Sequence, residues 1–130
     1  MRLLLAIAAV VSQLGSAAHA QEVCEAVKGA VIIAQDSDDT YLGKISSSYD
    51  SDSIFNEYGK YGSEYSSNSI WNEYGKFGSE YNTYSPHNSY SSSPPRIIKN
   101  RKVIGYLTAN KSIRASISPN LLKGLCEDYY

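Results

Sequence analysis

Residues 52–67 read DSIFNEYGKYGSEYSS, and residues 68–83 read NSIWNEYGKFGSEYNT. The two stretches are identical at eleven of sixteen positions. Self-similarity at a fixed period is typical of a repeated structural unit. The period weakens in both directions, and in a third unit Pro86 and His87 replace the isoleucine–aromatic pair. We place the repeat array at residues 47–93.

Each repeat combines residues that favour turns with aromatic residues. Glycine permits a positive φ, and the serine and asparagine side chains can bond to nearby backbone. Neither a helical period nor a sustained strand alternation is present. We predict ordered loops in which Ile54, Phe55, Ile70 and Trp71 contact a core. The alternative is disorder, since serine, glycine, tyrosine and asparagine dominate as they do in low-complexity segments.

Strand patterns flank the array. An apolar run, an aspartate-rich turn and a second run predict a hairpin over residues 30–46, and a similar pattern predicts another over residues 96–109. Residues 43–46 (GKIS) resemble residues 105–108 (GYLT). The predicted fold is mainly β: a small antiparallel sheet, four-stranded, built from two similar hairpins. The loop repeats would cover one face of it.

The C-terminal segment predicts one short helix over residues 118–124. Ser118 suits the N-cap, a proline follows at the first helical position, and Gly124 would lie just past the end. This helix would carry Cys126 towards Cys24, and in an oxidising compartment such a pair most simply forms a disulfide. A reactive or metal-binding pair is the alternative.

The first twenty residues have the pattern of a signal peptide. A basic Arg2 precedes the apolar run Leu3–Val11, and small residues end the segment near Ala20. The run is too short to span a bilayer. We therefore expect cleavage near Ala20 and a single small domain at residues 21–130. The protein would be secreted or periplasmic and not embedded in a membrane.

The candidates for catalysis are few. His87 is the one histidine after the signal segment, and a small hydrolase would need it oriented beside a serine and a carboxylate. Glu57 and Glu73 could act as acid and base. Because they recur with the repeat, we expect them to pair with Lys60 and Lys76 instead. The interpretation is a non-enzymatic protein, with the small hydrolase as third candidate.

One acidic cluster is a weak candidate for a metal site. Asp36, Asp38 and Asp39 share a turn, and oxygen ligands at close spacing suit Ca²⁺. The loop lacks the glycine and closing glutamate of an EF-hand, and a solvated hairpin turn is the plainer reading. We expect no required cofactor, with calcium as a weak alternative.

Charge is distributed unevenly although the net charge is −1. Residues 36–80 hold nine acids and three lysines, whereas residues 96–123 hold seven basic residues and no acid. Such asymmetry indicates either a basic binding face or mutual attraction between the two halves of one domain. Export and the near-zero net charge argue against nucleic acid as a partner.

Aromatic side chains among asparagine, serine and glycine can bind sugars or extended peptides. The candidate ligand surface consists of Tyr58, Tyr65, Trp71, Tyr74 and Tyr81. We expect an interaction module at the envelope or outside the cell, with a polysaccharide or an envelope protein as ligand. The alternative is a self-assembling structural element whose aromatic repeats stack between chains.

The motifs themselves resemble a known repeat. Residues 41–46 (YLGKIS), the Ser-Ile-x-Asn-x-Tyr-Gly-x-Tyr-Gly-Ser-x-Tyr units and residues 105–111 (GYLTANK) look like a tandem repeat of exported bacterial proteins. The resemblance covers residues 41 to about 125. It implies an exported, recurring module of unassigned function, and it implies no catalytic residues.

Overall fold

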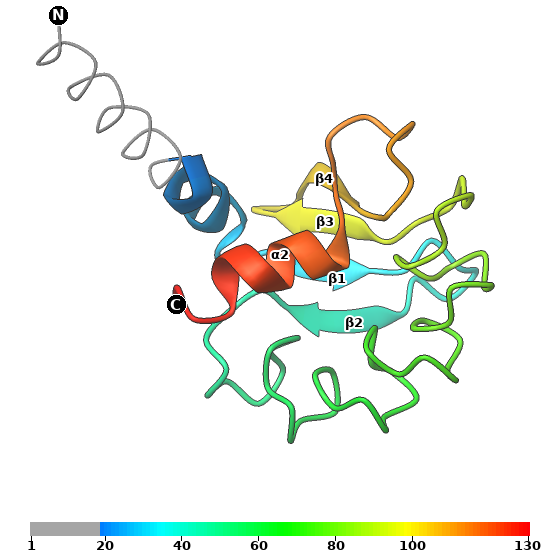
Figure 1. Cartoon of the computed structure of the whole chain (residues 1–130), viewed down its shortest axis with the longest axis horizontal. Coiled ribbons are helices and arrows are strands. Elements are labelled where there is room, and N and C mark those ends of the chain that lie inside the picture. Colours follow the sequence, from blue (N-terminus) through cyan, green and yellow to red (C-terminus); the bar gives the residue numbers. More distant parts are fainter. Residues whose placement is uncertain (1–18) are drawn as a thin grey trace, which may run out of the picture.

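The computed structural model describes residues 19–130, and the protein is mainly β, as the sequence predicts (Figure 1). The elements are a helix over residues 19–27, β1 (Val31–Ile33), β2 (Tyr41–Lys44), β3 (Arg96–Lys99), β4 (Lys102–Leu107), β5 (Ser116–Ile117) and α2 (Pro119–Cys126). The signal-peptide prediction falls almost wholly outside the described residues. Within them, no helix has the length and apolar character needed to cross a bilayer.

The sheet has the strand order β2-β1-β3-β4-β5. Each predicted hairpin is present, β1 with β2 and β3 with β4, and β1 joins β3 in an antiparallel pair. The expectation of a four-stranded, wholly antiparallel sheet is wrong in one respect, because β5 is a fifth strand and runs parallel to β4. With two residues, β5 is too short for its alternation to be read from sequence.

The second hairpin closes through a two-residue turn. Asn100 and Arg101 have φ values of 53° and 66°, and Lys99 lies opposite Lys102. Positive φ at both central residues defines the type I′ turn, whose twist matches that of paired strands. Asparagine tolerates this region better than most residues, which explains why the turn falls at Asn100.

The two hairpins have similar strand pairing as well as similar sequences. Lys44 in β2 forms a parallel bridge with Ser53, just as Tyr106 in β4 pairs in parallel with Ser116 in β5. The sheet is therefore closely two-fold symmetric about the β1–β3 pair, where Ile32 lies opposite Ile97. The resemblance between residues 43–46 and 105–108 reflects this shared local structure.

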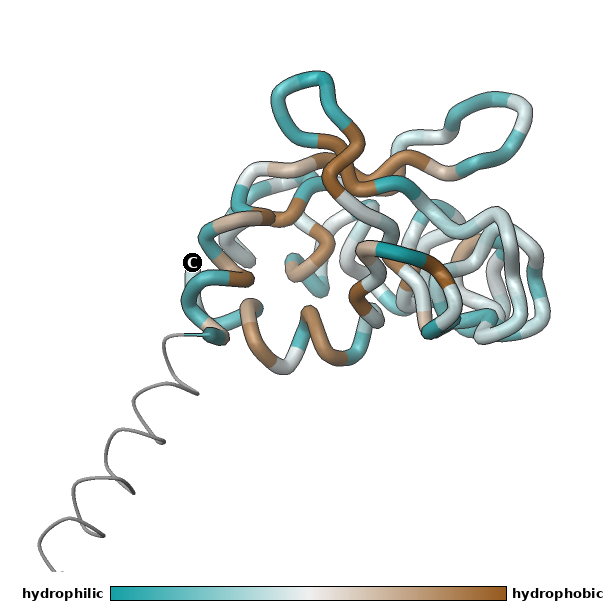
Figure 2. Tube along the Cα trace, turned by 90° about the horizontal axis from the view of Figure 1, so that it is seen from above, coloured by the Kyte–Doolittle hydropathy of each residue, from teal (hydrophilic) through white to brown (hydrophobic). Residues whose placement is uncertain are grey.

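The array follows from the first of these bridges. In Figure 1 it leaves β2, curves along the lower edge and right side of the molecule, and returns to β3. The face of the sheet presented in Figure 1 is crossed by α2 and not by the array. The array coils are pale in Figure 2, since serine, glycine and tyrosine have intermediate hydropathy, while hydrophobic segments concentrate in the sheet and helices.

One core joins the sheet, the helices and the array. Ile32, Leu42 and Leu107 from the strands and Leu122 from α2 are fully buried. The array adds four buried side chains to the same cluster, Ile54, Phe55, Ile70 and Phe77, and Trp71 packs against it half-buried. The predicted contacts of the isoleucine–aromatic pairs with the core are therefore confirmed.

The C-terminal helix begins where the sequence predicts and ends later. Ser118 Oγ accepts a hydrogen bond from Leu121 N at 3.1 Å, which confirms the N-cap. Gly124 does not end the helix, which continues to Cys126 and is capped at Glu127. No neighbour lies within 4 Å of the position that a Cβ on Gly124 would take. The helix over residues 19–27 was not predicted, although Ala20, Val23, Cys24 and Val27 have the i, i+3, i+4, i+7 spacing of one helix face.

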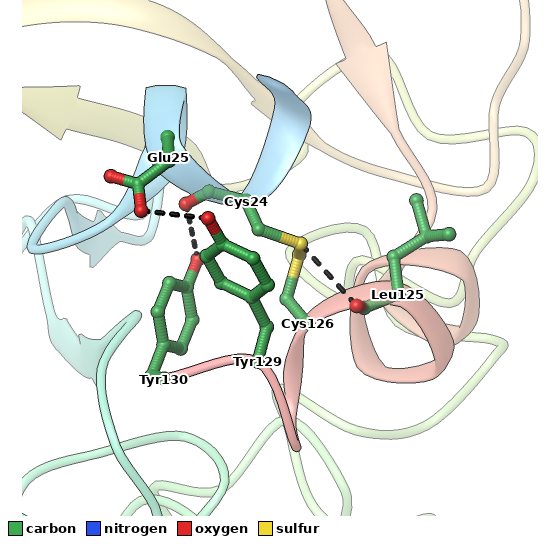
Figure 3. Close-up of a disulfide and its surroundings, with 6 residues drawn as sticks. All are labelled: Cys24, Glu25, Leu125, Cys126, Tyr129 and Tyr130. Atoms are coloured by element: carbon green, nitrogen blue, oxygen red, sulfur yellow. Dashed lines mark hydrogen bonds between the residues drawn. A yellow bond between two sulfur atoms is a disulfide. The ribbon is translucent and has the colours of Figure 1, made fainter. Parts of the chain in front are cut away.

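The disulfide joins the first helix to the last (Figure 3). Cys24 and Cys126 are bonded, with 5.4 Å between their Cα atoms. Two terminal tyrosines reinforce the junction: Tyr130 Oη donates to Cys24 O at 2.7 Å, and Tyr129 Oη donates to a Glu25 carboxylate oxygen at 2.7 Å. The helix over residues 19–27 and the C-terminal segment are thus held together by one disulfide and two hydrogen bonds.

Candidate ligand-binding surface

A continuous series of turns builds the array backbone. Asn56 N donates to Ser53 O, Gly59 N to Asn56 O, and the pattern continues as Ser69 N to Ser66 O and Asn72 N to Ser69 O. After Gly59 one wider step occurs, in which Ser63 N donates to Gly59 O. Four steps of three residues and one of four complete the sixteen-residue period.

Side chains fix each turn in the same way. The Oγ or Oδ1 atom of the first residue accepts a hydrogen bond from the backbone N–H two residues later. Tyr74 N donates to Asn72 Oδ1 at 3.1 Å, and Trp71 N donates to Ser69 Oγ at 3.0 Å. The amide of Asn72 also donates to Ser66 O at 3.1 Å, and Asn56 and Asn88 do the same one repeat away. These are the Asx and ST turns that asparagine and serine favour.

The wider step depends on a glycine. A Cβ at Gly78 would lie 2.0 Å from Asn72 O, and one at Gly62 would lie 2.0 Å from Asn56 O. A Cβ this close to a backbone oxygen would clash with it, and the clash could be relieved only by moving the turn. Glycine at these two positions therefore permits the close passage of one turn against the one before it.

This backbone holds a row of tyrosines out into solvent. Tyr49, Tyr58, Tyr65, Tyr74, Tyr81 and Tyr90 are 84–94% exposed. They follow one another at alternating intervals of nine and seven residues. Four belong to the candidate surface predicted from sequence, and their exposure agrees with that prediction. The other two, Tyr49 and Tyr90, were missed although each lies one period from a predicted member.

Trp71, the fifth predicted member, is held differently. Its Nε1 donates to Ile54 O at 2.6 Å, so the indole is held against the backbone of the preceding repeat. One repeat later, His87 Nε2 bonds Ile70 O at 2.9 Å, and the two rings are 5.7 Å apart. The carbonyl only accepts, so Nε2 carries the proton. Burial lowers the pKa of His87.

The third repeat unit therefore keeps the arrangement of the second. Pro86 is buried in the place of an isoleucine, and His87 takes the place of the tryptophan. In residues 19–130, no hydrogen bond joins the His87 ring to a serine hydroxyl or a carboxylate, although a hydrolase site would need both.

Two equivalent grooves lie between the exposed tyrosines. The first is lined by Glu57, Tyr58, Gly62, Ser63, Glu64 and Tyr65, and the second by the residues sixteen positions later, from Glu73 to Tyr81. Their open volumes are about 700 and 800 Å³. Trp71 contributes to both, and α2 closes their sides with Lys123 in the first and Asn120 in the second.

The expected pairing of the repeat glutamates with lysines is wrong. Lys76 reaches Asp36 at 3.6 Å, and Lys60 lies over the Tyr61 ring at 5.6 Å. In the described part of the chain the two ion pairs are Lys76 with Asp36 and Arg96 with Asp39, so neither Glu57 nor Glu73 has a cationic partner.

The aspartate turn is held by neighbours in the protein. Asp36 accepts hydrogen bonds from Thr40 N at 3.0 Å and Thr40 Oγ1 at 2.6 Å. Burial opposes its charge, but these bonds keep the pKa of Asp36 below its usual value. Across residues 19–130, no group of three acidic, histidine or cysteine side chains is arranged to hold a metal. A calcium ion bound by Asp36, Asp38 and Asp39 would have to displace these contacts.

Comparisons with protein-family models, with curated proteins and with solved structures found no match to this chain.

Proposed function

We propose that this protein is an exported, non-enzymatic binding module that acts at the cell envelope or outside the cell. The observation that carries the proposal is the row of six tyrosines, each at least 84% exposed, on a backbone fixed by repeated turns. Large aromatic side chains exposed in a regular series are typical of recognition surfaces.

The array supports binding because it is ordered before a ligand arrives. The turn hydrogen bonds and the buried Ile54 and Ile70 hold the backbone from which Tyr58 and Tyr74 project. A tyrosine has few rotatable bonds, so little conformational entropy is lost when a ligand covers it. The ligand would be an extended chain, a protein segment or a polysaccharide, that contacts several rings in series.

The test is binding by the disulfide-bonded protein to glycan arrays, peptidoglycan and isolated envelope proteins. We expect binding to at least one of these, and loss of it when Tyr58, Tyr65, Tyr74 and Tyr81 are together replaced by serine. The control replaces Val103 and Ile104, exposed apolar residues of β4, by serine. Absence of binding to all three classes, or equal loss in the control, would remove the support for the proposal.

A self-assembling structural element is the second candidate. Charge favours it: the glutamates of the array have no ion-pair partner within residues 19–130, while the exposed residues Arg101, Lys102, Lys111 and Arg114 lie on another part of the chain. Opposite charges on separate surfaces of one chain would draw copies together. A protein that stays monomeric at high concentration and low salt in sedimentation would exclude this candidate. A small hydrolase is the third candidate, and it would need detectable turnover that His87→Gln abolishes.

A further inference from the structure

We propose that the grooves between the exposed tyrosines bind lysine or arginine side chains of an extended basic polypeptide. The inference deepens the proposed function and rests on it, since it names the chemistry of the ligand for the same surface.

An ammonium group of the protein itself already occupies one groove. Lys123 projects from α2 into the first groove, and its Nζ lies 4.7 Å above the centre of the Trp71 ring. The same groove is lined by Glu57 and Glu64. An ammonium on an aromatic face, in a groove that also holds two carboxylates, is a combination of groups that would hold a lysine from another chain.

The second groove offers the same chemistry, and no lysine or arginine of residues 19–130 lines it. Its carboxylates are Glu73 and Glu80, and the α2 residue that lines it is Asn120, whereas Lys123 lines the first groove. A smaller cavity of about 500 Å³, lined by Glu64, Tyr65 and Glu73 among others, connects the two repeats along the array. A ligand that runs along the array therefore meets carboxylate and phenol groups in alternation.

The carboxylates are available to a ligand. None of the four groove glutamates takes part in an ion pair within residues 19–130. The neighbouring Glu64 raises the pKa of Tyr65, and Glu80 raises the pKa of Tyr81 in the same way. Each groove therefore contains a carboxylate close enough to a phenol to oppose its ionisation, and a cationic ligand would meet both groups.

Charge complementarity favours a basic polypeptide over a sugar chain. Neutral sugars stack on open aromatic faces, but the Trp71 face is covered by Lys123, and Lys76 covers Phe77 and Tyr84 at 5.3 Å. Four of the six exposed tyrosines, the ones that line the grooves, each directly follow a glutamate in the sequence, as in Glu73–Tyr74 and Glu80–Tyr81. Flexible lysine and arginine side chains can enter such grooves from a backbone that passes over the tyrosines.

The test is titration of the disulfide-bonded protein with a short oligolysine. Binding is measured by the change in Trp71 fluorescence and, independently, by calorimetry. We expect binding that weakens with salt. Replacing Glu57, Glu64, Glu73 and Glu80 by glutamine should weaken it at least about tenfold. A smaller set of changes, Glu22→Gln with Asp128→Asn, removes exposed acids that line neither groove and should change the affinity far less.

A variant that removes a positive charge from the first groove distinguishes specific recognition from an effect of net charge. Lys123→Met empties the first groove of its internal ammonium, and we expect oligolysine to bind more tightly. Lys28→Met makes the same change in net charge at an exposed site outside the grooves. Equal gains in the two variants would overturn the inference, because the gain would then come from net charge alone.

The remaining outcomes also discriminate. Tyrosine-dependent binding of a neutral oligosaccharide, with none of oligolysine, would overturn this inference and leave the proposed function standing. Equally tight binding of a chitosan oligomer would show that an amino sugar is the ligand. Salt-sensitive oligomers that vanish in the four-glutamine variant would show that a second copy is the ligand. Binding of none of these probes, together with empty glycan and envelope-protein tests, would end both proposals.

Discussion

Trp71 and His87 make the same hydrogen bond one repeat apart. Trp71 Nε1 donates to Ile54 O, and His87 Nε2 donates to Ile70 O, so each ring nitrogen reaches the main-chain oxygen seventeen residues before it. The two hydrogen bonds show that the repeat is a repeat of structure as well as of sequence, since two different side chains donate to the equivalent backbone carbonyl. It also makes the stability of the array dependent on the protonation of a histidine.

The first prediction concerns pH. Burial lowers the pKa of His87 below its ordinary value of 6.5, so the unfolded chain binds the proton more readily than the folded protein. The stabilising effect of neutral His87 is complete above pH 6.5 and is lost as pH falls from there through the folded pKa. The loss cannot exceed about 1.4 kcal/mol per pH unit for one group.

Denaturant unfolding from about pH 7 to about pH 5 measures this effect. The control is His87→Trp, which supplies an N–H donor that does not titrate. Its free energy of unfolding should fall less over this range than that of the wild type. Parallel pH profiles for the two proteins would show that His87 does not titrate differently on folding.

The second prediction concerns the asparagine turns. Asn72→Ala removes the acceptor for Tyr74 N and the donor to Ser66 O. With each bond contributing about 1 kcal/mol, we expect a loss near 2 kcal/mol in the free energy of unfolding. Asn72→Asp keeps the acceptor and loses the donor, and it should cost less. Thermal unfolding of the three proteins compares them, and an aspartate variant as unstable as the alanine variant would contradict the assignment.

The third prediction separates two glycines. Gly78→Ala places a Cβ 2.0 Å from Asn72 O, so the turn must move, and we expect a loss of about 2 kcal/mol or more. Gly124→Ala lies inside α2 with no atom within 4 Å of the new Cβ. It should raise stability by about 0.5–1 kcal/mol, since alanine favours the helix interior. Opposite shifts in melting temperature are the expected result.

The fourth prediction concerns the disulfide. Cys24 and Cys126 are 102 residues apart, and cross-linking so long a loop stabilises a fold by up to about 4–5 kcal/mol on the chain-entropy model. Reduction, or replacement of both cysteines by serine, should lower the melting temperature sharply. A reductant should leave the double serine variant unchanged. A small effect of reduction would mean that the helices hold the chain ends together without the bond.

The fifth prediction concerns one buried hydroxyl. Ser46 Oγ is buried and has no hydrogen-bond partner among residues 19–130, whereas Thr108 Oγ1, at the equivalent place in the second hairpin, accepts from Asn110 N at 3.0 Å. Ser46→Ala should leave stability unchanged or raise it by about 1 kcal/mol, because an unsatisfied polar group leaves the core. Thr108→Val should be destabilising. Calorimetry of both variants checks the contrast.

Much of the architecture could be predicted from local pattern. The hairpins, the N-cap at Ser118 and the burial of Ile54 and Ile70 each depend on a few neighbouring residues whose chemistry restricts the backbone. The exposed positions of Tyr58 and Tyr74 also follow from the period, because two repeats that fold alike must present the same residues to solvent.

Other features depend on contacts between distant segments. The parallel pairing of β5 with β4 and the continuation of α2 through Gly124 arise from packing that outweighs weak local signals. The partner of Lys76 is Asp36, forty residues earlier, and not the nearby Glu73. One side of the first groove is formed where α2 brings Lys123 beside Trp71.

The sequence by itself determined the repeat, its turn chemistry and which rings recur, since these follow from residue types at fixed spacing. Only the tertiary structure decided which carboxylates lack partners and where a cation already sits. Both depend on how separate elements pack, and the energy of a charge depends on the neighbours that folding brings to it.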